Sequence, residues 1–185
     1  MKLVKIGGSV IAFPNQLRQL CDLLNKSNSN ILIVPGGGPF ADTVRETDSK
    51  YRLKPATAHW MAILGMDQFA LLLSDLLPNA QVIEKPQIVK KGLAILRPAV
   101  FLEKSDPLPH SWDVTSDSIT AYFAHLLNLN TFVKITVRNT QQTSLHNLVD
   151  PYLSELLVKY SLSIQIISIF DLEKIKTTLI SENEK

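Results

Sequence analysis

The sequence predicts an α/β fold, a three-layer αβα sandwich around a mostly parallel central sheet. Short apolar or β-branched segments alternate with helical patterns along the chain, an order typical of parallel sheets with helical connections. Two of these segments, residues 2–6 and 31–34, each run directly into consecutive glycines. Because ligands of such folds bind at the carboxyl ends of the strands, both glycine loops are candidate parts of a site.

The 185-residue chain is 45% hydrophobic and 19% charged, values that predict a single domain over residues 1–185. The net charge of +2 and the lack of a lysine or arginine run argue against a nucleic-acid-binding protein. The single cysteine, Cys21, cannot form an internal disulfide and favours a reducing compartment. No apolar segment is long enough and free enough of polar residues to span a membrane. We therefore expect a cytoplasmic protein with a small-molecule substrate and no nucleic-acid or membrane partner.

The first part of the chain combines two strand patterns with three helical patterns. Apolar residues in the helical patterns recur at intervals of three and four, as Leu17, Leu20 and Leu24 do. Pro14 suits the first turn of the first helix. The expected strands are residues 2–6 and 31–34, and the expected helices are residues 14–25, 39–46 and 56–77.

The rest of the chain continues the alternation. Apolar and β-branched segments bounded by polar turns predict strands, and Asp171 is a typical N-cap for the last helix. A polar loop with prolines, residues 103–110, precedes the helix that begins near Ser116. The expected strands are residues 80–84, 92–96, 99–102, 131–137 and 163–169, and the expected helices are residues 116–127, 151–160 and 171–179.

Lys5 precedes Gly7, Gly8 and Ser9 at the end of the first strand. Lysine supplies a point charge suited to phosphate, and glycine amides can approach phosphate oxygens closely. Because side chains alternate along a strand, Lys5 and Gly7 lie on one side of the strand end. We expect Lys5 to neutralise a transferring phosphoryl group, while the Gly7 and Gly8 amides hold its oxygens. A plain turn after an edge strand is the alternative interpretation.

The second glycine loop is Gly36, Gly37 and Gly38, between Pro35 and Pro39. It is not a Walker A loop, because no lysine followed by serine or threonine comes after it, and it is not a dinucleotide-binding motif. Three consecutive glycines are conformationally costly in a simple turn. The pattern therefore favours a functional loop beside the N-terminus of the helix that follows.

Asp117 is the third candidate for chemistry. Thr115 and Ser116 are suitable caps for the helix that follows, so Asp117 is expected in its first turn, where the helix dipole favours a carboxylate. One interpretation is a capping motif and nothing more. The other is that Asp117 emerges beside the glycine loops and orients Lys5 or a second lysine through a charge-assisted bond.

The helix at residues 56–77 carries His59, Trp60 and Asp67. Trp60 and Asp67 are seven residues apart and share a helix face. Buried polar groups need partners, so this helix could be one wall of a substrate pocket. The four histidines of the chain are scattered, and no His/Cys pair has ligand spacing, so the sequence predicts no protein-held metal. Mg²⁺ could still arrive with a nucleotide.

With these motifs the chain resembles the amino acid kinase family, which has the carbamate kinase-like fold. The resemblance rests on residues 5–9, 35–38 and 115–117. It is most specific at residues 59–62 and 112–118, which are similar to the branch of the family that acts in methanofuran biosynthesis. The resemblance implies an enzyme, an ATP-dependent kinase that phosphorylates an (aminomethyl)furan-methyl phosphate.

The same resemblance implies a role for each candidate residue. Lys5 and Asp117 would be catalytic, and Lys134 would bind the nucleotide, with ATP and Mg²⁺ as the cofactors. The phosphate-binding residues would be Gly7, Gly8, Ser9, Gly36, Gly37 and Gly38. The substrate-binding residues would be Asp42, His59 and Asp67.

The resemblance further implies a phosphate and substrate half at about residues 1–128 and a shortened nucleotide half at about residues 129–185. Relatives usually carry Asp-Gly soon after the lysine that corresponds to Lys134, whereas no glycine follows Lys134 here. A second hypothesis is therefore a binding or partner subunit with weak or no turnover. Acetylglutamate or uridylate kinase activity is a weaker alternative, because residues 59–67 match neither group well. Apolar surface on residues 61–77 leads us to expect a homodimer.

Overall fold

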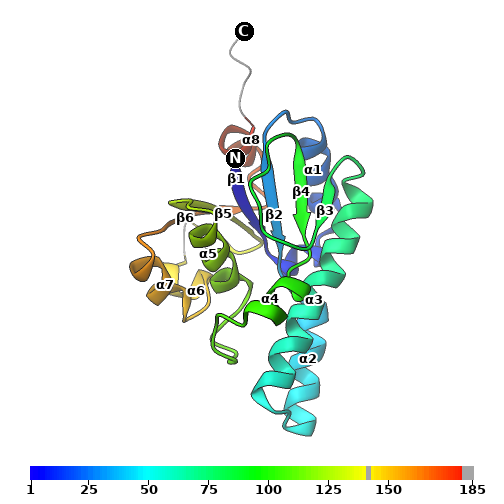
Figure 1. Ribbon diagram of the computed structural model, residues 1–185. Coiled ribbons are helices and arrows are strands. Elements are labelled where there is room, and N and C mark those ends of the chain that lie inside the picture. Colours follow the sequence, from blue (N-terminus) through cyan, green and yellow to red (C-terminus); the bar gives the residue numbers. More distant parts are fainter. Residues whose placement is uncertain (141–142, 181–185) are drawn as a thin grey trace.

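The computed structural model describes residues 1–140 and 143–180. Its centre is a six-stranded sheet with the order β3-β4-β2-β1-β5-β6 (Figure 1). Every neighbouring pair of strands is parallel, so the predicted mostly parallel sheet is confirmed. The strands are β1 (Lys2–Ile6), β2 (Ile31–Pro35), β3 (Gln81–Ile83), β4 (Leu93–Leu96), β5 (Thr131–Thr136) and β6 (Ser163–Ser168).

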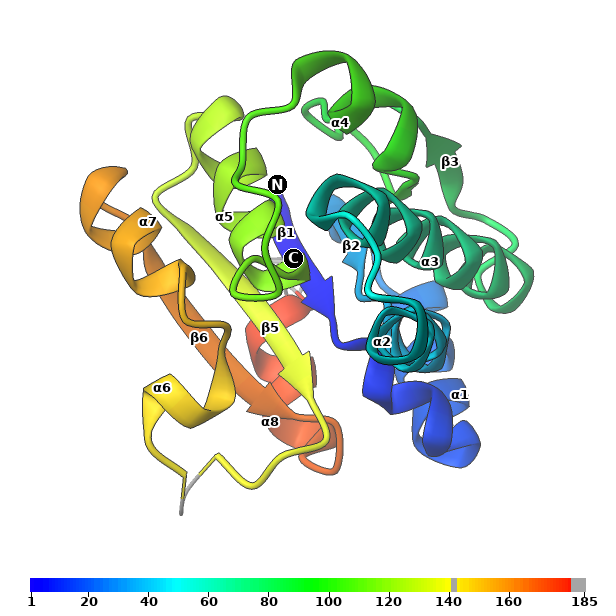
Figure 2. The same ribbon diagram turned by 90° about the horizontal axis from the view of Figure 1, so that it is seen from below.

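Helices pack on both faces of the sheet and complete the predicted αβα sandwich. Helices α1, α8 and the C-terminal part of α3 share one apolar core with the sheet, and α4, α5 and α7 share the other. Figure 2 shows α5 beside β1 and β5. The helices are η1 (Gly8–Ala12), α1 (Pro14–Asn25), α2 (Gly38–Tyr51), α3 (Pro55–Leu76), α4 (Ala99–Ser105), α5 (Ser116–Leu126), α6 (Leu145–Leu148), α7 (Leu153–Lys159) and α8 (Leu172–Leu179).

The alternation of side chains along β1 decides where its lysine points. Val4 and Ile6 are fully buried in the core beneath α1 and α8, whereas Leu3 is buried on the opposite face with α5. Lys5 therefore lies on the α5 side of the sheet, near its carboxyl edge. On β5, Val133 and Ile135 are buried beneath α1 and α8, so Lys134 also lies on the α5 side of the sheet. Lys5 and Lys134 are paired in the register of β1 and β5.

One expected strand is a helix. Residues 99–102 were predicted to be extended, but they belong to α4. The Asp67 carboxylate on α3 accepts a hydrogen bond from the Ala99 amide at 3.2 Å, which satisfies one of the free N–H groups at the start of α4. A contact between residues 32 positions apart stabilises this helix, so the local apolar pattern alone gave the wrong prediction.

Helices α2 and α3 form an antiparallel pair that extends beyond the sheet (Figure 1). The sequence predicted the first helix only to residue 46, but it continues to Tyr51. Gly65 allows the two helices to approach, since a Cβ at this position would lie 3.2 Å from the Ala41 amide nitrogen. No helix in the described part of the chain is long and apolar enough to cross a membrane.

Candidate active site

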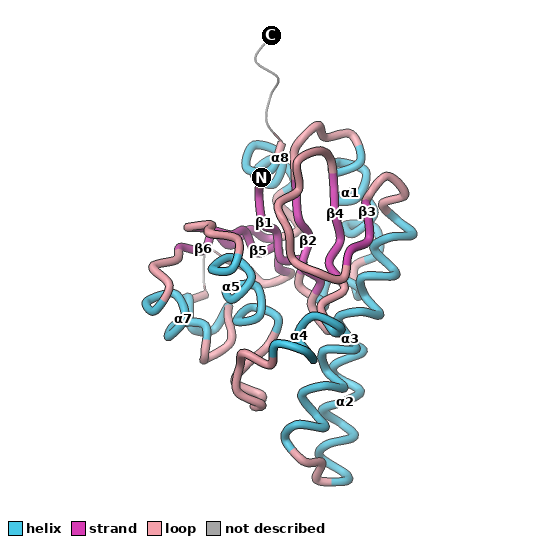
Figure 3. The backbone as a smooth tube through the Cα atoms, in the orientation of Figure 1, coloured by secondary structure: helices cyan, strands magenta, loops and turns pink. Residues whose placement is uncertain are grey.

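A cavity of about 680 Å³ opens at the carboxyl edge of the sheet. Both glycine loops reach it, together with α2, α3, the start of α5 and the segment at residues 148–151. Figure 3 shows in pink the loop that joins α4 to α5, residues 106–115, which supplies a further wall. Segments far apart in the sequence, from Lys5 to Pro151, therefore meet around one space, as expected for a parallel α/β sheet.

Lys5, Lys134 and Asp117 form a buried charge cluster at the floor of this cavity. The Lys5 Nζ lies 2.8 Å from Asp117 Oδ1, and the Lys134 Nζ donates a hydrogen bond to Asp117 Oδ2. Lys134 also donates to the Leu148 carbonyl at 2.6 Å. Each of the three charged residues is at most 6% exposed. Two cations share one carboxylate, so the cluster carries an excess positive charge that is poorly screened by water.

Thr115 places Asp117 by capping α5, as the sequence predicted. The Thr115 side chain accepts a hydrogen bond from the Asp117 amide, and Asp117 lies in the first turn of the helix. Burial raises the pKa of Asp117, but the charges of Lys5 and Lys134 outweigh this effect and bring the pKa below its usual value. Asp117 therefore remains a carboxylate at neutral pH.

The surroundings of Lys134 lower the pKa of its ammonium group toward neutrality. Burial and, after it, the charge of Lys5 lower the pKa of Lys134 from 10.5 to about 8, against the opposing effect of Asp117. Protonation of this ammonium is thus sensitive to pH in a range where enzymes are commonly assayed.

We predict opposite effects of pH on activity and on stability. The rate of any reaction that needs the Lys134 charge should fall as pH rises through about 8. The unfolded chain binds the Lys134 proton more tightly, so this group should make the free energy of unfolding rise between pH 8 and 10.5. Urea unfolding and kcat across this range test both effects. Lys134→Met should remove the rise in stability, and an unchanged rise in this variant would contradict the assignment.

Asp150 is a positioning residue that the sequence reasoning did not assign. One of its carboxylate oxygens accepts hydrogen bonds from the Thr115 amide and hydroxyl and from the Ser118 amide, at 2.8–3.0 Å. The other accepts from the Ser118 hydroxyl and from the Leu153 amide. Asp150 thus ties the start of α5 to the start of α7. A buried carboxylate 32 residues from Ser118 has no local sequence signal.

The two glycine loops pack directly on each other. A Cβ at Gly8 would overlap the backbone of Gly37 and Gly38, and a Cβ at Gly36 would lie 2.5 Å from the Gly8 amide nitrogen. The Gly7 amide donates to the Ile135 carbonyl at 2.9 Å, and the Gly36 amide donates to the carbonyl of Ile6 at 2.8 Å. These two amides donate to strand carbonyls. They are therefore not free to bind a phosphate, although the sequence predicted that they would.

Gly7, Gly8, Ser9, Gly37 and Gly38 do line the cavity, and Gly36 does not. Gly38 is also the first residue of α2, so the positive end of that helix dipole faces the same space. Fewer backbone amides can therefore bind a phosphate than the sequence predicted. Those that remain surround the contact between Gly8 and Gly38.

A pair of alanine substitutions tests this packing. Gly92 has φ +72° and open space around its Cβ position, so Gly92→Ala should cost about 1–2 kcal/mol from backbone strain alone. Gly38 has φ +53° and would also overlap the Gly8 backbone. Gly38→Ala should therefore lower the free energy of unfolding clearly more than Gly92→Ala in matched urea titrations. Equal losses would show that the contact between the loops does not restrict residue 38.

The helical wall of the cavity includes His59 but not Asp67. His59 and Met66, seven positions apart on α3, both face the cavity. Asp67 lies seven positions after Trp60 and shares the neighbouring face of the helix, which does not line the cavity. That face packs on α4, and Asp67 forms an ion pair at 3.3 Å with Arg97, the residue that follows β4. Burial raises the pKa of Asp67 against these partners. The structure thus separates Asp67 from the candidate site, contrary to its predicted substrate-binding role.

Asp42 lines the cavity together with three residues to which the sequence reasoning gave no individual role, Arg45, Asp48 and Trp112. The Trp112 indole nitrogen donates to the Asp48 carboxylate at 2.7 Å, and the Arg45 guanidinium lies 4.2 Å from the centroid of the Trp112 ring. Arg45 also lies 3.8 Å from the exposed carboxylate of Asp42. Arg45 and Asp48 lie three and six residues after Asp42, so all three are near one another on α2. This spacing is the sequence signal that could have identified Arg45 and Asp48.

Three solved structures are similar to the chain in fold. The uridylate kinase of Archaeoglobus fulgidus has a TM-score of 0.67 and 12% identity over 97% of each chain. An isopentenyl phosphate kinase has a TM-score of 0.63 and 16% identity over 99% of this chain and 97% of that chain. The carbamate kinase of Giardia lamblia, bound to AMP-PNP, has a TM-score of 0.56 and 9% identity over 97% and 96%. These likenesses establish the carbamate kinase-like fold predicted from the sequence.

Two sequence comparisons are more specific. The [5-(aminomethyl)furan-3-yl]methyl phosphate kinase of Methanocaldococcus jannaschii is 33% identical over 145 residues, which are 74% of this chain. The chain spans only 65% of the length of that relative. The family model described as the amino acid kinase family matches residues 1–137, which include both glycine loops and the charge cluster. The resemblance seen in the sequence is thereby confirmed, and the chain belongs to the amino acid kinase family.

Proposed function

We propose that this protein is a kinase that transfers the terminal phosphoryl group of ATP to the phosphate of a small phosphomonoester. One observation carries the proposal: the buried cluster of Lys5, Asp117 and Lys134 lies in the same cavity as the two packed glycine loops. Fixed cations beside backbone amides at a helix N-terminus are suited to the charge that develops during phosphoryl transfer.

The proposed reaction uses position and charge more than covalent chemistry. An oxygen of the acceptor phosphate attacks the terminal phosphorus of ATP, and ADP leaves with the electrons of the broken bond. Lys5 would face the transferring group, since its Nζ lies 3.7 Å from the position of a Cβ on Gly7. Asp117 would hold the two ammonium groups apart in fixed positions. Mg²⁺ would arrive with the nucleotide and supply further charge neutralisation.

The acceptor that we propose is [5-(aminomethyl)furan-3-yl]methyl phosphate, the compound named for the relative that is 33% identical. It presents a phosphate, a flat ring and an ammonium group. Arg45 is suited to the acceptor phosphate, and the exposed carboxylate of Asp42 is suited to the ammonium. His59 and Trp112 both line the cavity and offer aromatic side chains against which the furan ring could pack. The protein would then act in methanofuran biosynthesis.

The nucleotide would lie toward β5 and β6. Thr136, Arg138 and residues 148–151 line this side of the cavity, and the Arg138 side chain donates to the Asn147 carbonyl. The segment from β5 to α7 is therefore connected to the charge cluster through Lys134 and Leu148. In this arrangement residues 148–151 would contact the nucleotide without an Asp-Gly turn.

Nucleotide binding and turnover can be tested separately. We expect Mg-ATP and Mg-ADP to raise the melting temperature of the purified protein by several degrees. Diphosphate formation should follow with the aminomethylfuran phosphate, and not with UMP, isopentenyl phosphate or carbamate. A thermal shift with transfer to UMP would replace the proposed acceptor. No thermal shift at millimolar nucleotide would favour a binding subunit without turnover.

We also propose that the chain acts as a homodimer in the cytoplasm. Leu64 and Leu71 are seven residues apart on α3, and both are about half exposed, at 53% and 52%. Such a pair on one helix face is a possible contact between two copies. The mass of the protein in solution, compared with that of Leu64→Glu, tests this. A monomeric mass for the wild type would contradict the dimer.

A further inference from the structure

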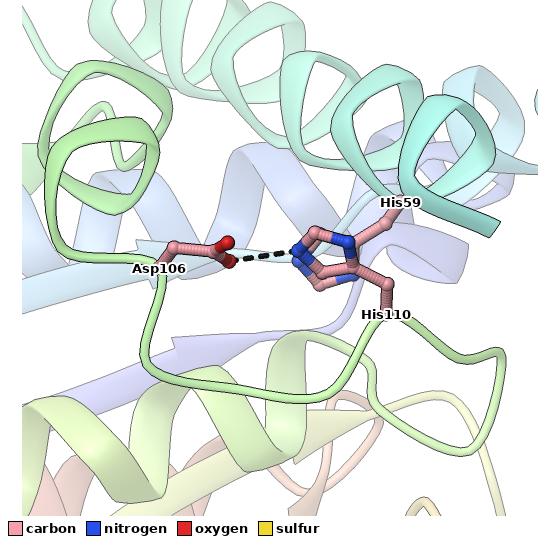
Figure 4. Close-up of side chains that lie close together, drawn as sticks. All are labelled: His59, Asp106 and His110. Atoms are coloured by element: carbon pink, nitrogen blue, oxygen red, sulfur yellow. Dashed lines mark hydrogen bonds and ion pairs between the residues drawn. The ribbon is translucent and has the colours of Figure 1, made fainter.

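Three potential metal ligands from two separate segments meet at the mouth of the cavity. His59 comes from α3, whereas Asp106 and His110 come from the loop between α4 and α5 (Figure 4). One donor atom of each residue lies within 4.8 Å of the other two. The sequence gave no sign of this cluster, because His59 and His110 are 51 positions apart. The fold alone brings them together.

The three side chains of the cluster contact one another directly. The His110 Nε2 lies 2.7 Å from Asp106 Oδ1, and the imidazole rings of His59 and His110 are stacked with centroids 4.4 Å apart and planes 25° apart. Figure 4 shows the Asp106 carboxylate directed at the edge of both rings. The hydrogen bond explains the position of Asp106 and His110, but it does not explain why His59 presents its ring beside the same carboxylate.

Two imidazole nitrogens and one carboxylate oxygen are a donor set that suits Zn²⁺ and related divalent transition metals. In tetrahedral coordination zinc ligands lie about 2.0–2.2 Å from the metal, so any two donor atoms are separated by roughly 3.3–3.5 Å. The donors here lie within 4.8 Å of one another, and a small rearrangement that opens the 2.7 Å contact between His110 Nε2 and Asp106 Oδ1 would bring them to that spacing. His59 and His110 also line the cavity, so a fourth coordination position would face the space where a small molecule binds.

We propose that His59, Asp106 and His110 form a binding site for a divalent transition metal of the Zn²⁺ class. The site is separate from the charge cluster on which the proposed phosphoryl transfer depends. A bound ion would join α3 to the loop between α4 and α5 and would fix one edge of the cavity. Mg²⁺ prefers oxygen ligands in octahedral geometry and should bind this nitrogen-rich set poorly.

The direct test is titration of the untagged, metal-free protein with ZnCl₂ by calorimetry. We expect one equivalent of Zn²⁺ to bind. Asp106→Asn, His59→Gln and His110→Gln should each weaken this binding at least about tenfold, because each removes one ligand. His125 is the matched control: its ring is stacked on Tyr160 outside the cluster, so His125→Gln should leave binding unchanged. Equal weakening by His125→Gln, or none by the three variants, would overturn the site.

Two further measurements guard against loss of folding in a variant. Asp106 is exposed, so Asp106→Asn should keep the wild-type melting temperature without metal while losing the increase that ZnCl₂ gives the wild type. Co²⁺ bound at the site should show the visible absorption of a low-coordinate nitrogen and oxygen complex, and Mg²⁺ should not displace it. Displacement by Mg²⁺, or an equal thermal shift in Asp106→Asn, would overturn the proposal. These readouts do not depend on kinase activity, so they separate this site from the proposed function.

Discussion

Replacing Asp117 with asparagine is expected to lower the free energy of unfolding by about 3–5 kcal/mol, the range typical when one partner of a buried ion pair is removed. The carboxylate is 3% exposed and is the acceptor shared by Lys5 and Lys134. A neutral amide would leave two buried ammonium groups facing each other, and the pKa of Lys134, already lowered to about 8, should fall further. Urea unfolding at neutral pH measures the loss.

Two variants make this prediction specific. Asp113→Asn changes an exposed aspartate in the loop that precedes α5 and should leave the free energy of unfolding nearly unchanged. Adding Lys134→Met to Asp117→Asn removes one of the stranded cations and should recover part of the stability. If Asp117→Asn were as stable as the wild type, the carboxylate would not be compensating the two lysines.

Lys5→Met should lower kcat by about 10²- to 10³-fold, the effect expected when one preorganised group that stabilises the transition state is lost. The effect on KM for ATP should be smaller, because Lys134 and the loop backbone remain. The fold should persist, since Asp117 keeps one cationic partner in Lys134. Steady-state kinetics with the proposed acceptor measures this loss.

Lys2→Met is the control for this rate prediction, because Lys2 stands at the start of the same strand, away from the cavity. It should retain the wild-type kcat. An unaltered kcat in Lys5→Met, with normal folding, would remove Lys5 from the mechanism. Loss of both kcat and nucleotide-induced thermal stabilisation would instead assign Lys5 a role in ground-state binding.

Much of the fold was predictable because its signals are local. Apolar strands ending in glycine and helices with caps such as Thr115 each depend on neighbouring residues. The period of two along β1 likewise places Lys5 on one face. The prediction could not supply the order of the strands. That order places β5 next to β1, and it alone makes Lys134 a partner of Lys5.

The parts that were missed depend on contacts between distant segments. Asp67 is the type of residue that often lines a substrate pocket, but its carboxylate binds Arg97 and the first amide of α4 instead. Asp150 anchors α5 from a loop that follows β5, and Trp112 reaches Asp48 across 64 positions. Each of these interactions exists only after the tertiary structure has formed, so a single sequence contains no spacing that marks it.

The pairing of β1 with β5 has a consequence for protein synthesis. β1 leaves the ribosome before β5, which emerges only after both glycine loops, α3 and α5. A nascent chain can thus form the phosphate loops early, yet it has only one of the two lysines until β5 docks. Pairings of high sequence separation form slowly, so the charge cluster is completed only when β5 has docked. A nascent chain that ends before β5 would therefore lack the proposed activity and would not consume ATP.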